Sequence, residues 1–345
     1  MNTYSRLVEE EERCSLVSSR DVAKHAGVSQ STVSRVLNDP SKVNDQIVKK
    51  VQEAIKALNY RPNSVARSLV SNRTRTIALI SGPLHNPFFV ETTTSIVNYA
   101  ESKGYRTMVF FENTGENKPI YEEVLSERVD GILLSSIFRD DPIFDDLQNL
   151  DIPVIMYNRR HNKGGNFVEI DNMQSGRLAA SHLLGLGHQH ICVVGGPDHT
   201  STFYGRKQGF LEEYKTLTGT EVPPSFIKDT NTTEGAVHES IVEVMSCTPP
   251  PSAIFAATDA IAIYVMDKLQ QMGFHVPEDV SVCGMDNVTL AKHQSFQLTS
   301  IGHKGPKNLG LISAEYLIEM MENPSEQQVQ ITLEPVLYDR KTTKS

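Results

Sequence analysis

The chain has 345 residues, enough for two or three domains that each bury a hydrophobic core. Its hydrophobic content is 39%, and its apolar runs stay far below the roughly 20 residues of a membrane-spanning helix, which excludes an integral membrane protein. The net charge of −9 is unevenly divided, because residues 18–75 carry a net +7 and residues 76–345 a net −14. We therefore expect a basic module that can bind phosphates, attached to an acidic body that repels DNA.

The first 17 residues lack any hydrophobic period and contain four consecutive glutamates, so we expect a flexible N-terminal extension. They have neither the basic start nor the apolar stretch of a secretory signal, which predicts a cytoplasmic protein. The four cysteines form no C-x-x-C pair, a pattern typical of reduced thiols rather than of a disulfide framework or a zinc site. They are Cys14, Cys192, Cys247 and Cys283.

Residues 18–60 predict a small domain of three helices. Ser18 or Ser19, Ser29 and Asn44 stand where the three N-caps are needed, and Gly27 makes the first turn. The apolar residues expected to face inward are Val22, Ala23 and Ala26, then Val33, Val36 and Leu37, then Ile47, Val48, Val51, Ile55 and Leu58.

From residue 76 onward, short β-rich runs alternate with helical stretches, which predicts parallel α/β sheets. The expected strands cover residues 77–80, 107–111, 131–134, 154–157, 191–194, 253–256 and 280–283, with a last β-like segment at 329–337. These strands are too many for one sheet in a single domain. We therefore expect two similar lobes with a ligand site in the cleft between them.

The stretch from Asp21 to Asn38 has the two short helices and the turn glycine of a helix-turn-helix. At the start of its second helix, Gln30, Ser31 and Arg35 can donate hydrogen bonds to base edges, while hydroxyl side chains nearby suit phosphates. The predicted DNA-binding residues here are Ser29, Gln30, Ser31, Thr32, Ser34, Arg35 and Lys42. The pattern also fits an amphipathic hairpin packed in another helical domain.

Residues 18–69 resemble the DNA-binding headpiece of the lactose/galactose repressor family, nearly without gaps. The resemblance implies that residues 61–75 form a hinge helix and linker, with Asn63, Ala66 and Leu69 contacting DNA and Leu69 wedged into the minor groove. The residue chemistry agrees, because Pro62 can begin a helix, Ala66 allows two copies to approach closely, and Leu69 is an apolar wedge.

The same resemblance covers residues 76–340 and implies a two-lobed core like that of periplasmic binding proteins. Its matching segments include His85-Asn86-Pro87-Phe88-Phe89, Asp171-Asn172, Arg206-x-x-Gly209-Phe210 and Met285-Asp286-Asn287. By family position Phe88 stacks on a ligand ring, Arg206 holds ligand oxygens and Asp286 accepts ligand hydroxyls, a combination that suits a sugar. Asn158 and Thr258 complete the expected effector site. Phe88 also fits a core position, and Arg206 and Asp286 also fit surface or interlobe ion pairs.

Several positions depart from the family pattern. Asn158 and Thr258 stand where many relatives carry Asp and Asn, and residues 302–307 make a crossover that is one residue longer and lacks the common Gln-Pro. Ligand identity therefore stays open. A regulator controlled by a protein corepressor also fits the sequence, and so does a solute-binding receptor, although residues 18–69 and the missing signal peptide argue against the receptor.

No G-x-S-x-G, P-loop or G-x-G-x-x-G string occurs, so we expect no enzyme and no cofactor. His182, His188 and His190 lack a convergent carboxylate or thiolate pattern, so no metal site is expected there. The sequence predicts a repressor that binds a palindromic operator as a dimer and is controlled by a small molecule, for which a carbohydrate is the favoured class. A dimer is expected because no leucine heptads follow the last β-like segment.

Overall fold

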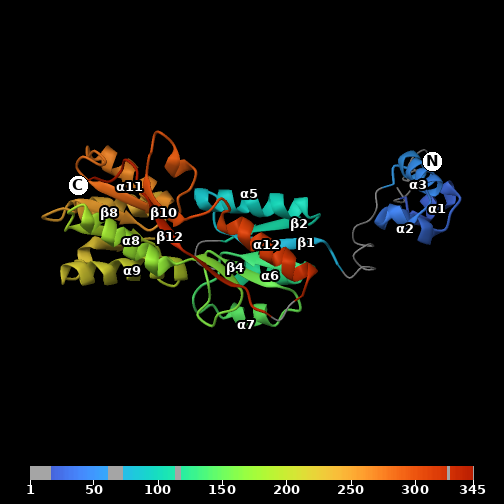
Figure 1. Ribbon diagram of the computed structural model, residues 1–345, viewed down its shortest axis with the longest axis horizontal. Helices are drawn as coiled ribbons and strands as arrows, with labels where there is room; N and C mark the ends of the chain where they lie inside the picture. Colours follow the sequence, from blue (N-terminus) through green and yellow to red (C-terminus); the bar gives the residue numbers. More distant parts are fainter. Residues whose placement is uncertain (1–16, 61–72, 113–117, 325–326, 345) are drawn as a thin grey trace, which may run out of the picture. The chain divides into compact units, whose positions relative to one another are not determined.

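The computed structural model describes residues 17–60, 73–112, 118–324 and 327–344, and the chain divides into two compact units, residues 1–74 and 75–345 (Figure 1). The predicted N-terminal extension lies outside the described residues, apart from its last position. Most of the predicted hinge, residues 61–72, also lies outside them, and so do Asn63, Ala66 and Leu69.

The first unit contains helices α1 (Ser19–Ala26), α2 (Gln30–Asn38) and α3 (Asp45–Ala57), with a 3-10 turn η1 (Pro40–Lys42). Ser18 caps α1 in a capping box with Asp21, and Gly27 ends that helix at φ 66°, a left-handed conformation that glycine adopts without strain. Ser29 caps α2 and Asn44 caps α3, so the predicted caps are confirmed.

The core of this unit is small and apolar. Val22, Ala23, Val33, Val36, Val51 and Ala54 are buried, and the other residues expected to face inward pack against them half-buried. Because three elements contribute to one cluster, each helix depends on the others for stability.

The second unit consists of two α/β lobes. The sheet of lobe 1 has the order β11-β5-β4-β3-β1-β2, all neighbours parallel. Its strands are β1 (Thr76–Ser81), β2 (Arg106–Phe111), β3 (Gly131–Leu134), β4 (Val154–Tyr157), β5 (Phe167–Ile170) and β11 (Gln330–Leu333). Helices α5 (Pro87–Ser102) and α12 (Leu309–Glu322) pack together on one face. The other face is covered by α6 (Lys118–Ser126) and α7 (Ile143–Gln148).

The sheet of lobe 2 has the order β12-β10-β9-β8-β6-β7, parallel except for the pair of β10 and β12. Its strands are β6 (Ile191–Gly195), β7 (Ile227–Asp229), β8 (Ala253–Ala256), β9 (Ser281–Met285), β10 (Thr299–His303) and β12 (Pro335–Tyr338). Helix α8 (Asn172–Gly185) packs with α9 (Ser201–Thr218), and α10 (Glu234–Met245) packs with α11 (Asp259–Gln271). Short 3-10 turns, η2 (Pro224–Phe226) and η3 (Leu290–Lys292), complete the lobe.

The chain crosses between the lobes three times: before α8, before α12 and between β11 and β12. The prediction of one β-like segment at residues 329–337 was therefore wrong in one respect. β11 joins the sheet of lobe 1 while β12 joins that of lobe 2, and Glu334 is the single residue between them. The two-lobed α/β prediction is confirmed.

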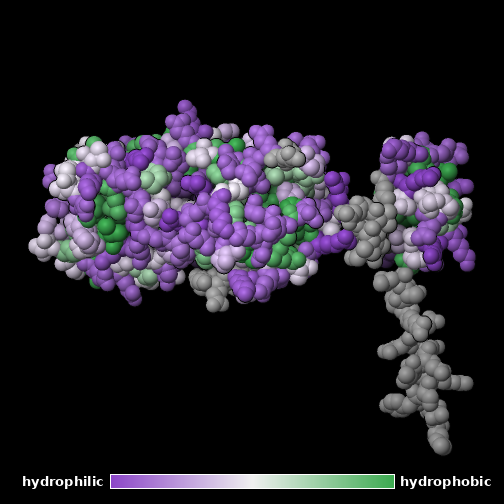
Figure 2. Space-filling model, turned by 90° about the horizontal axis from the view of Figure 1, so that it is seen from below, coloured by the Kyte–Doolittle hydropathy of each residue, from purple (hydrophilic) through white to green (hydrophobic). Residues whose placement is uncertain are grey.

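Figure 2 shows a mostly hydrophilic face on the two-lobed unit, with hydrophobic patches separated from one another. Among the described residues, no helix is both long and apolar enough to cross a membrane.

Candidate functional sites

The start of α2 is the candidate DNA-contacting surface. Ser29, Gln30, Ser31, Ser34 and Arg35 are exposed there, and Thr32 is half-buried. Their side chains are held differently. The Ser29 hydroxyl accepts from the Thr32 backbone N–H at 3.1 Å as the helix cap, so its first role is to fix the start of α2.

Gln30 joins α2 to α1, because its Nε2 donates to the Ser19 hydroxyl at 2.9 Å and its Oε1 accepts from Arg20 at 3.5 Å. These contacts orient a side chain that was expected to reach base edges. Arg35 has no side-chain partner among the described residues and is free to contact DNA. Lys42 lies apart in η1, where it is exposed and forms a 2.9 Å ion pair with Asp39.

In the two-lobed unit, all five residues expected to bind an effector line one cavity between the lobes. Phe88 comes from the start of α5 and Asn158 from the residue after β4, both in lobe 1. Arg206 from α9, Thr258 before α11 and Asp286 after β9 come from lobe 2. The cavity is tight, about 60 Å³. It adjoins a second cavity of about 300 Å³, which shares Phe88, Arg206 and Asp286 and reaches the crossover before α12.

Arg206 is the centre of the polar network in this cleft. It is 1% exposed, and its Nη2 forms a 2.9 Å ion pair with Asp286. Its Nε donates to the Asn172 side chain at 3.0 Å and its Nη1 to the Ala257 carbonyl at 2.6 Å. A buried guanidinium with this many fixed bonds presents a rigid donor surface to the cavity.

The carboxyl groups of the cleft sit in an unusual environment. Burial raises the pKa of Asp286 to about 6, although Arg206 beside it acts in the opposite direction. Burial and the nearby charge of Asp286 raise the pKa of Asp259. Asp259 accepts from the Ser300 hydroxyl at 2.6 Å and from the Val288 backbone N–H at 2.9 Å, so it anchors the turn that carries Asp286.

Asn158 offers the cavity an acceptor atom without a partner. Its backbone has φ 63°, a left-handed conformation that asparagine tolerates. Its carbonyl accepts from the Thr202 hydroxyl across the lobes at 2.8 Å, whereas its side-chain Oδ1 is buried and has no hydrogen bond within the described parts of the chain. A buried acceptor without a partner costs stability, so a ligand donor is expected at this atom.

Thr258 and Phe88 are held by the fold as well as facing the cavity. The Thr258 hydroxyl accepts from the Ile261 backbone N–H at 3.1 Å and caps α11. Phe88 is 8% exposed and packs edge-on against Phe89, with ring centroids 5.2 Å apart. Both are therefore pre-positioned parts of the cavity wall.

Two glycines, Gly176 in α8 and Gly209 in α9, allow these helices to pack closely. A Cβ at Gly209 would lie 1.9 Å from the Met173 carbonyl oxygen, and one at Gly176 would lie 2.1 Å from the Arg206 carbonyl oxygen. This close packing brings Asn172 at the start of α8 beside Arg206. The sequence segments thus build the network that holds Arg206.

Sequence reasoning missed a second charged pair in the cleft. Arg159 is buried and makes two bonds to the Glu112 carboxylate, at 2.9 and 3.1 Å, and both residues line the cavity. Thr202 and Thr232 also line it. Arg159 directly follows Asn158 in the sequence, and this neighbourhood to a predicted site residue is the feature that could have identified it.

Two of the three histidines that the sequence analysis considered, His182 and His188, form hydrogen bonds to hydroxyl groups. The ring nitrogens of His188 bond the hydroxyls of Ser252 and Ser281 at 2.9 and 3.0 Å, and His182 bonds Thr343 at 3.1 Å. Cys192 and Cys283 are buried free thiols and Cys247 is a half-buried one, while Cys14 lies outside the described residues.

Comparison with known proteins agrees with this geometry. Residues 19–63 match the model of the lacI family of bacterial regulatory proteins, and residues 180–343 match a periplasmic binding protein-like domain. The chain is 32% identical to the HTH-type transcriptional repressor PurR of Aliivibrio fischeri (strain MJ11), over 93% of this chain and 96% of the relative. The chain belongs to the lacI family.

Another lacI-family relative, the ribose operon repressor of Escherichia coli (strain K12), is 30% identical over 93% of this chain and 98% of its own. Two solved structures are similar in fold. One is a lac repressor dimer bound to operator and the anti-inducer ONPF, with a TM-score of 0.82 and 26% identity, covering 95% of this chain and 99% of that one. The other is the transcriptional regulator CelR in complex with cellobiose, with a TM-score of 0.69 and 28% identity, covering 94% and 99%.

Proposed function

We propose that this lacI-family protein is a transcriptional repressor that binds a palindromic operator as a dimer and is controlled by a small molecule in the interlobe cleft. The observation that carries the proposal is the combination of two sites in one chain. A helix-turn-helix exposes hydrogen-bonding side chains at the start of α2, and a cleft in the same chain gathers five predicted ligand-contacting residues. The named relatives are repressors, and we propose no catalytic role and a cytoplasmic location.

The predicted DNA-contacting side chains, exposed except for the half-buried Thr32, have distinct roles. Gln30, Ser31 and Arg35 contact base edges, and Ser29, Thr32, Ser34 and Lys42 contact phosphates. Two headpieces of a dimer place two copies of α2 in successive major grooves, which requires an inverted repeat. The net +7 of residues 18–75 favours the phosphate backbone.

The effector part rests on the chemistry of the cleft. Arg206 supplies donors, Asp286 and the Oδ1 of Asn158 supply acceptors, and Phe88 supplies an apolar face, a set that matches a carbohydrate. The CelR structure is a cellobiose complex, which supports the same class. Because the inner cavity is only about 60 Å³, we propose that the lobes separate to admit the effector, which then extends into the adjoining 300 Å³.

The mechanism follows from differential binding. A ligand that prefers one lobe arrangement shifts the population of that arrangement, and the lobes transmit the shift to residues 61–75, which join them to the headpiece. A ligand that favours the operator-bound arrangement acts as corepressor, and one that favours the other arrangement acts as inducer.

Operator binding is tested with a sequence selected from random duplexes. Fluorescence anisotropy titrations of the wild-type protein, Arg35→Ala and Arg177→Ala compare a predicted base contact with an exposed arginine in the two-lobed unit. We expect Arg35→Ala to lose about 1–3 kcal/mol of operator affinity and to relax the sequence preference, while Arg177→Ala binds like wild type. Equal affinity of all three proteins would rule out the assignment of Arg35.

The effector class is tested by a thermal-shift screen of sugars, because a ligand that binds only the folded state raises the unfolding temperature. A sugar found in this way should shift the wild-type protein but not Asn158→Ala. If no sugar shifts the unfolding temperature but the protein binds its operator selectively, the effector is not a carbohydrate, whereas the assignment as a repressor stands.

A further inference from the structure

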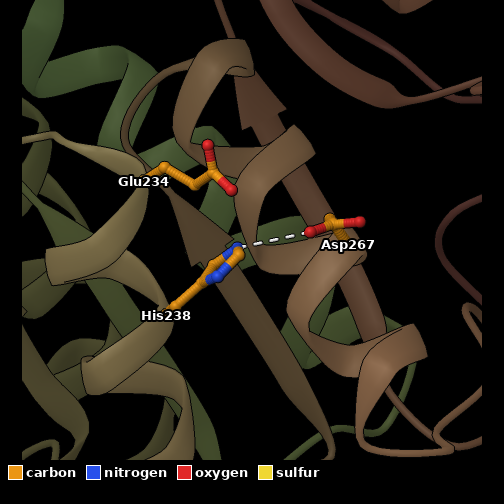
Figure 3. Close-up of side chains that lie close together, drawn as sticks. All are labelled: Glu234, His238 and Asp267. Atoms are coloured by element: carbon orange, nitrogen blue, oxygen red, sulfur yellow. Dashed lines mark ion pairs between the residues drawn. The ribbon is translucent and has the colours of Figure 1, made fainter.

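Away from the cleft, the structure brings three metal-ligating side chains together on lobe 2. Glu234 and His238 project from α10, and Asp267 projects from the neighbouring α11 (Figure 3). Glu234 and His238 are four residues apart and therefore share one helix face. One ligand atom from each residue lies within 4.8 Å of the other two.

The contact between His238 and Asp267 fits a shared metal ion better than a hydrogen bond. The Nε2 of His238 lies 3.4 Å from the Asp267 Oδ2. This Nε2 is buried and has no hydrogen-bond partner among the described residues. Two ligands of a tetrahedral zinc ion, each about 2.0–2.1 Å from it, lie roughly 3.3–3.4 Å apart.

The surroundings leave the cluster negatively charged. In the described parts of the chain, neither Glu234 nor Asp267 forms an ion pair with lysine or arginine. Asp267 is oriented by Gln271, whose Nε2 donates to Oδ2 at 2.7 Å, in the manner of an outer-shell partner that fixes a ligating carboxylate. Glu234 is exposed, so one side of the cluster is open for a water ligand.

We propose that Glu234, His238 and Asp267 bind a divalent transition-metal ion of the zinc class, with water as the fourth ligand. One imidazole and two carboxylates match the preference of zinc, whereas calcium and magnesium require more oxygen ligands. The ion connects α10 to α11. Thr232 lies just before α10 and Thr258 just before α11, and both line the effector cavity, so the metal joins the two helices that carry this part of its wall.

The test is a Zn²⁺ titration of the full chain, freed of any purification tag, by calorimetry and by competition with a chromogenic zinc indicator. The variants are His238→Gln and Glu234→Gln, with His275→Gln as control. His275 also faces a carboxylate four residues away, Asp279 at 3.1 Å, but that pair is exposed and already hydrogen-bonded. All variants keep the four cysteines, so zinc binding by a thiol would be equal in each.

We expect one zinc ion per chain in the wild-type protein and in His275→Gln. Loss of the direct ligand His238 should weaken binding by at least the roughly 10–100-fold that loss of an outer-shell partner costs. Zinc should also raise the unfolding temperature of wild type but not of His238→Gln. Equal zinc affinity of wild type and His238→Gln, or no saturable binding by wild type, would overturn the site. If His238→Gln fails to fold, the exposed Glu234→Gln decides in the same way.

Discussion

Arg206 lines the cleft and is at the same time fixed by contacts within the protein. It is buried with Asp286 and hydrogen-bonded to Asn172 and Ala257, so its charge is compensated within lobe 2. The family resemblance pointed to Arg206 and Asp286 as ligand contacts. That they pair with each other could not be predicted from the sequence, because the residues are 80 positions apart, in α9 and directly after β9, and meet only in the folded lobe.

Replacing Arg206 should therefore cost stability before any ligand is added. Arg206→Met leaves the Asp286 carboxylate buried without its partner, and we expect a loss of about 3–5 kcal/mol in the free energy of unfolding. Urea unfolding of the ligand-free protein measures it. The control is Arg177→Met, whose pair with Glu212 is exposed and should contribute about 0–1 kcal/mol. Similar losses for both variants would show that Arg206 is not held as described.

Glu169 predicts a pH dependence. It lies in the buried strand β5, 2.8 Å from Arg160, and burial raises its pKa from 4.5 to about 7 despite that arginine. Between these two pH values the folded protein retains a proton that the unfolded chain has lost, so rising pH destabilises the fold. Relative to wild type, Glu169→Gln should gain about 1–3 kcal/mol in unfolding free energy from pH 4.5 to 7. A constant difference over this range contradicts the raised pKa.

At the scale of elements, the contact between α8 and α9 positions Arg206 in the cleft. It requires glycine at three positions, Gly176, Gly205 and Gly209, where a Cβ would meet the facing helix. Gly209 stands in a segment that matches the family, but the reason for a glycine there, the approach of the α8 backbone, becomes visible only in the structure.

Gly209→Ala should separate the two helices, because its Cβ would lie 1.9 Å from the Met173 carbonyl oxygen. We expect a loss of about 1–3 kcal/mol from this overpacking, and weaker effector binding as Arg206 shifts. Gly185→Ala is the matched control, since it lies in α8 with nothing within 4 Å of its added Cβ and should stabilise the helix by up to about 1 kcal/mol. Thermal unfolding compares the two, and equal effects would contradict the close contact.

Strands were predicted where the sequence has continuous apolar runs and were missed where it does not. β1, β3, β4, β6, β8 and β9 are buried along their whole length, as expected for parallel sheets. β5 was not predicted because Glu169 interrupts its apolar pattern, and β7 was not predicted because it has only three residues. The local sequence does not indicate that residues 329–337 are divided between two sheets, because a single residue, Glu334, separates two similar β-like runs.

At the scale of the whole molecule, any coupling between the operator site and the effector site must be reciprocal. If the effector changes operator affinity by some factor, the operator must change effector affinity by the same factor, typically 5–150-fold. Titrating a sugar found by the thermal-shift screen with and without operator, and operator with and without that sugar, measures both factors. Two sites that act independently would give factors of one in both titrations.

The second crossing between the lobes, which returns the chain to lobe 1 before α12, has a consequence for the order in which the chain becomes structured during synthesis. The sheet of lobe 1 is completed by β11, which is made about 160 residues after its neighbour β5, and α12 on the same lobe is also made late. At about 5–20 residues per second, the ribosome needs roughly ten to thirty seconds for that interval. The hydrophobic core of the helix-turn-helix unit, in contrast, is built from residues within the first 60 positions. Each newly made molecule therefore completes its DNA-binding helices well before it has a finished cleft with which to respond to a ligand.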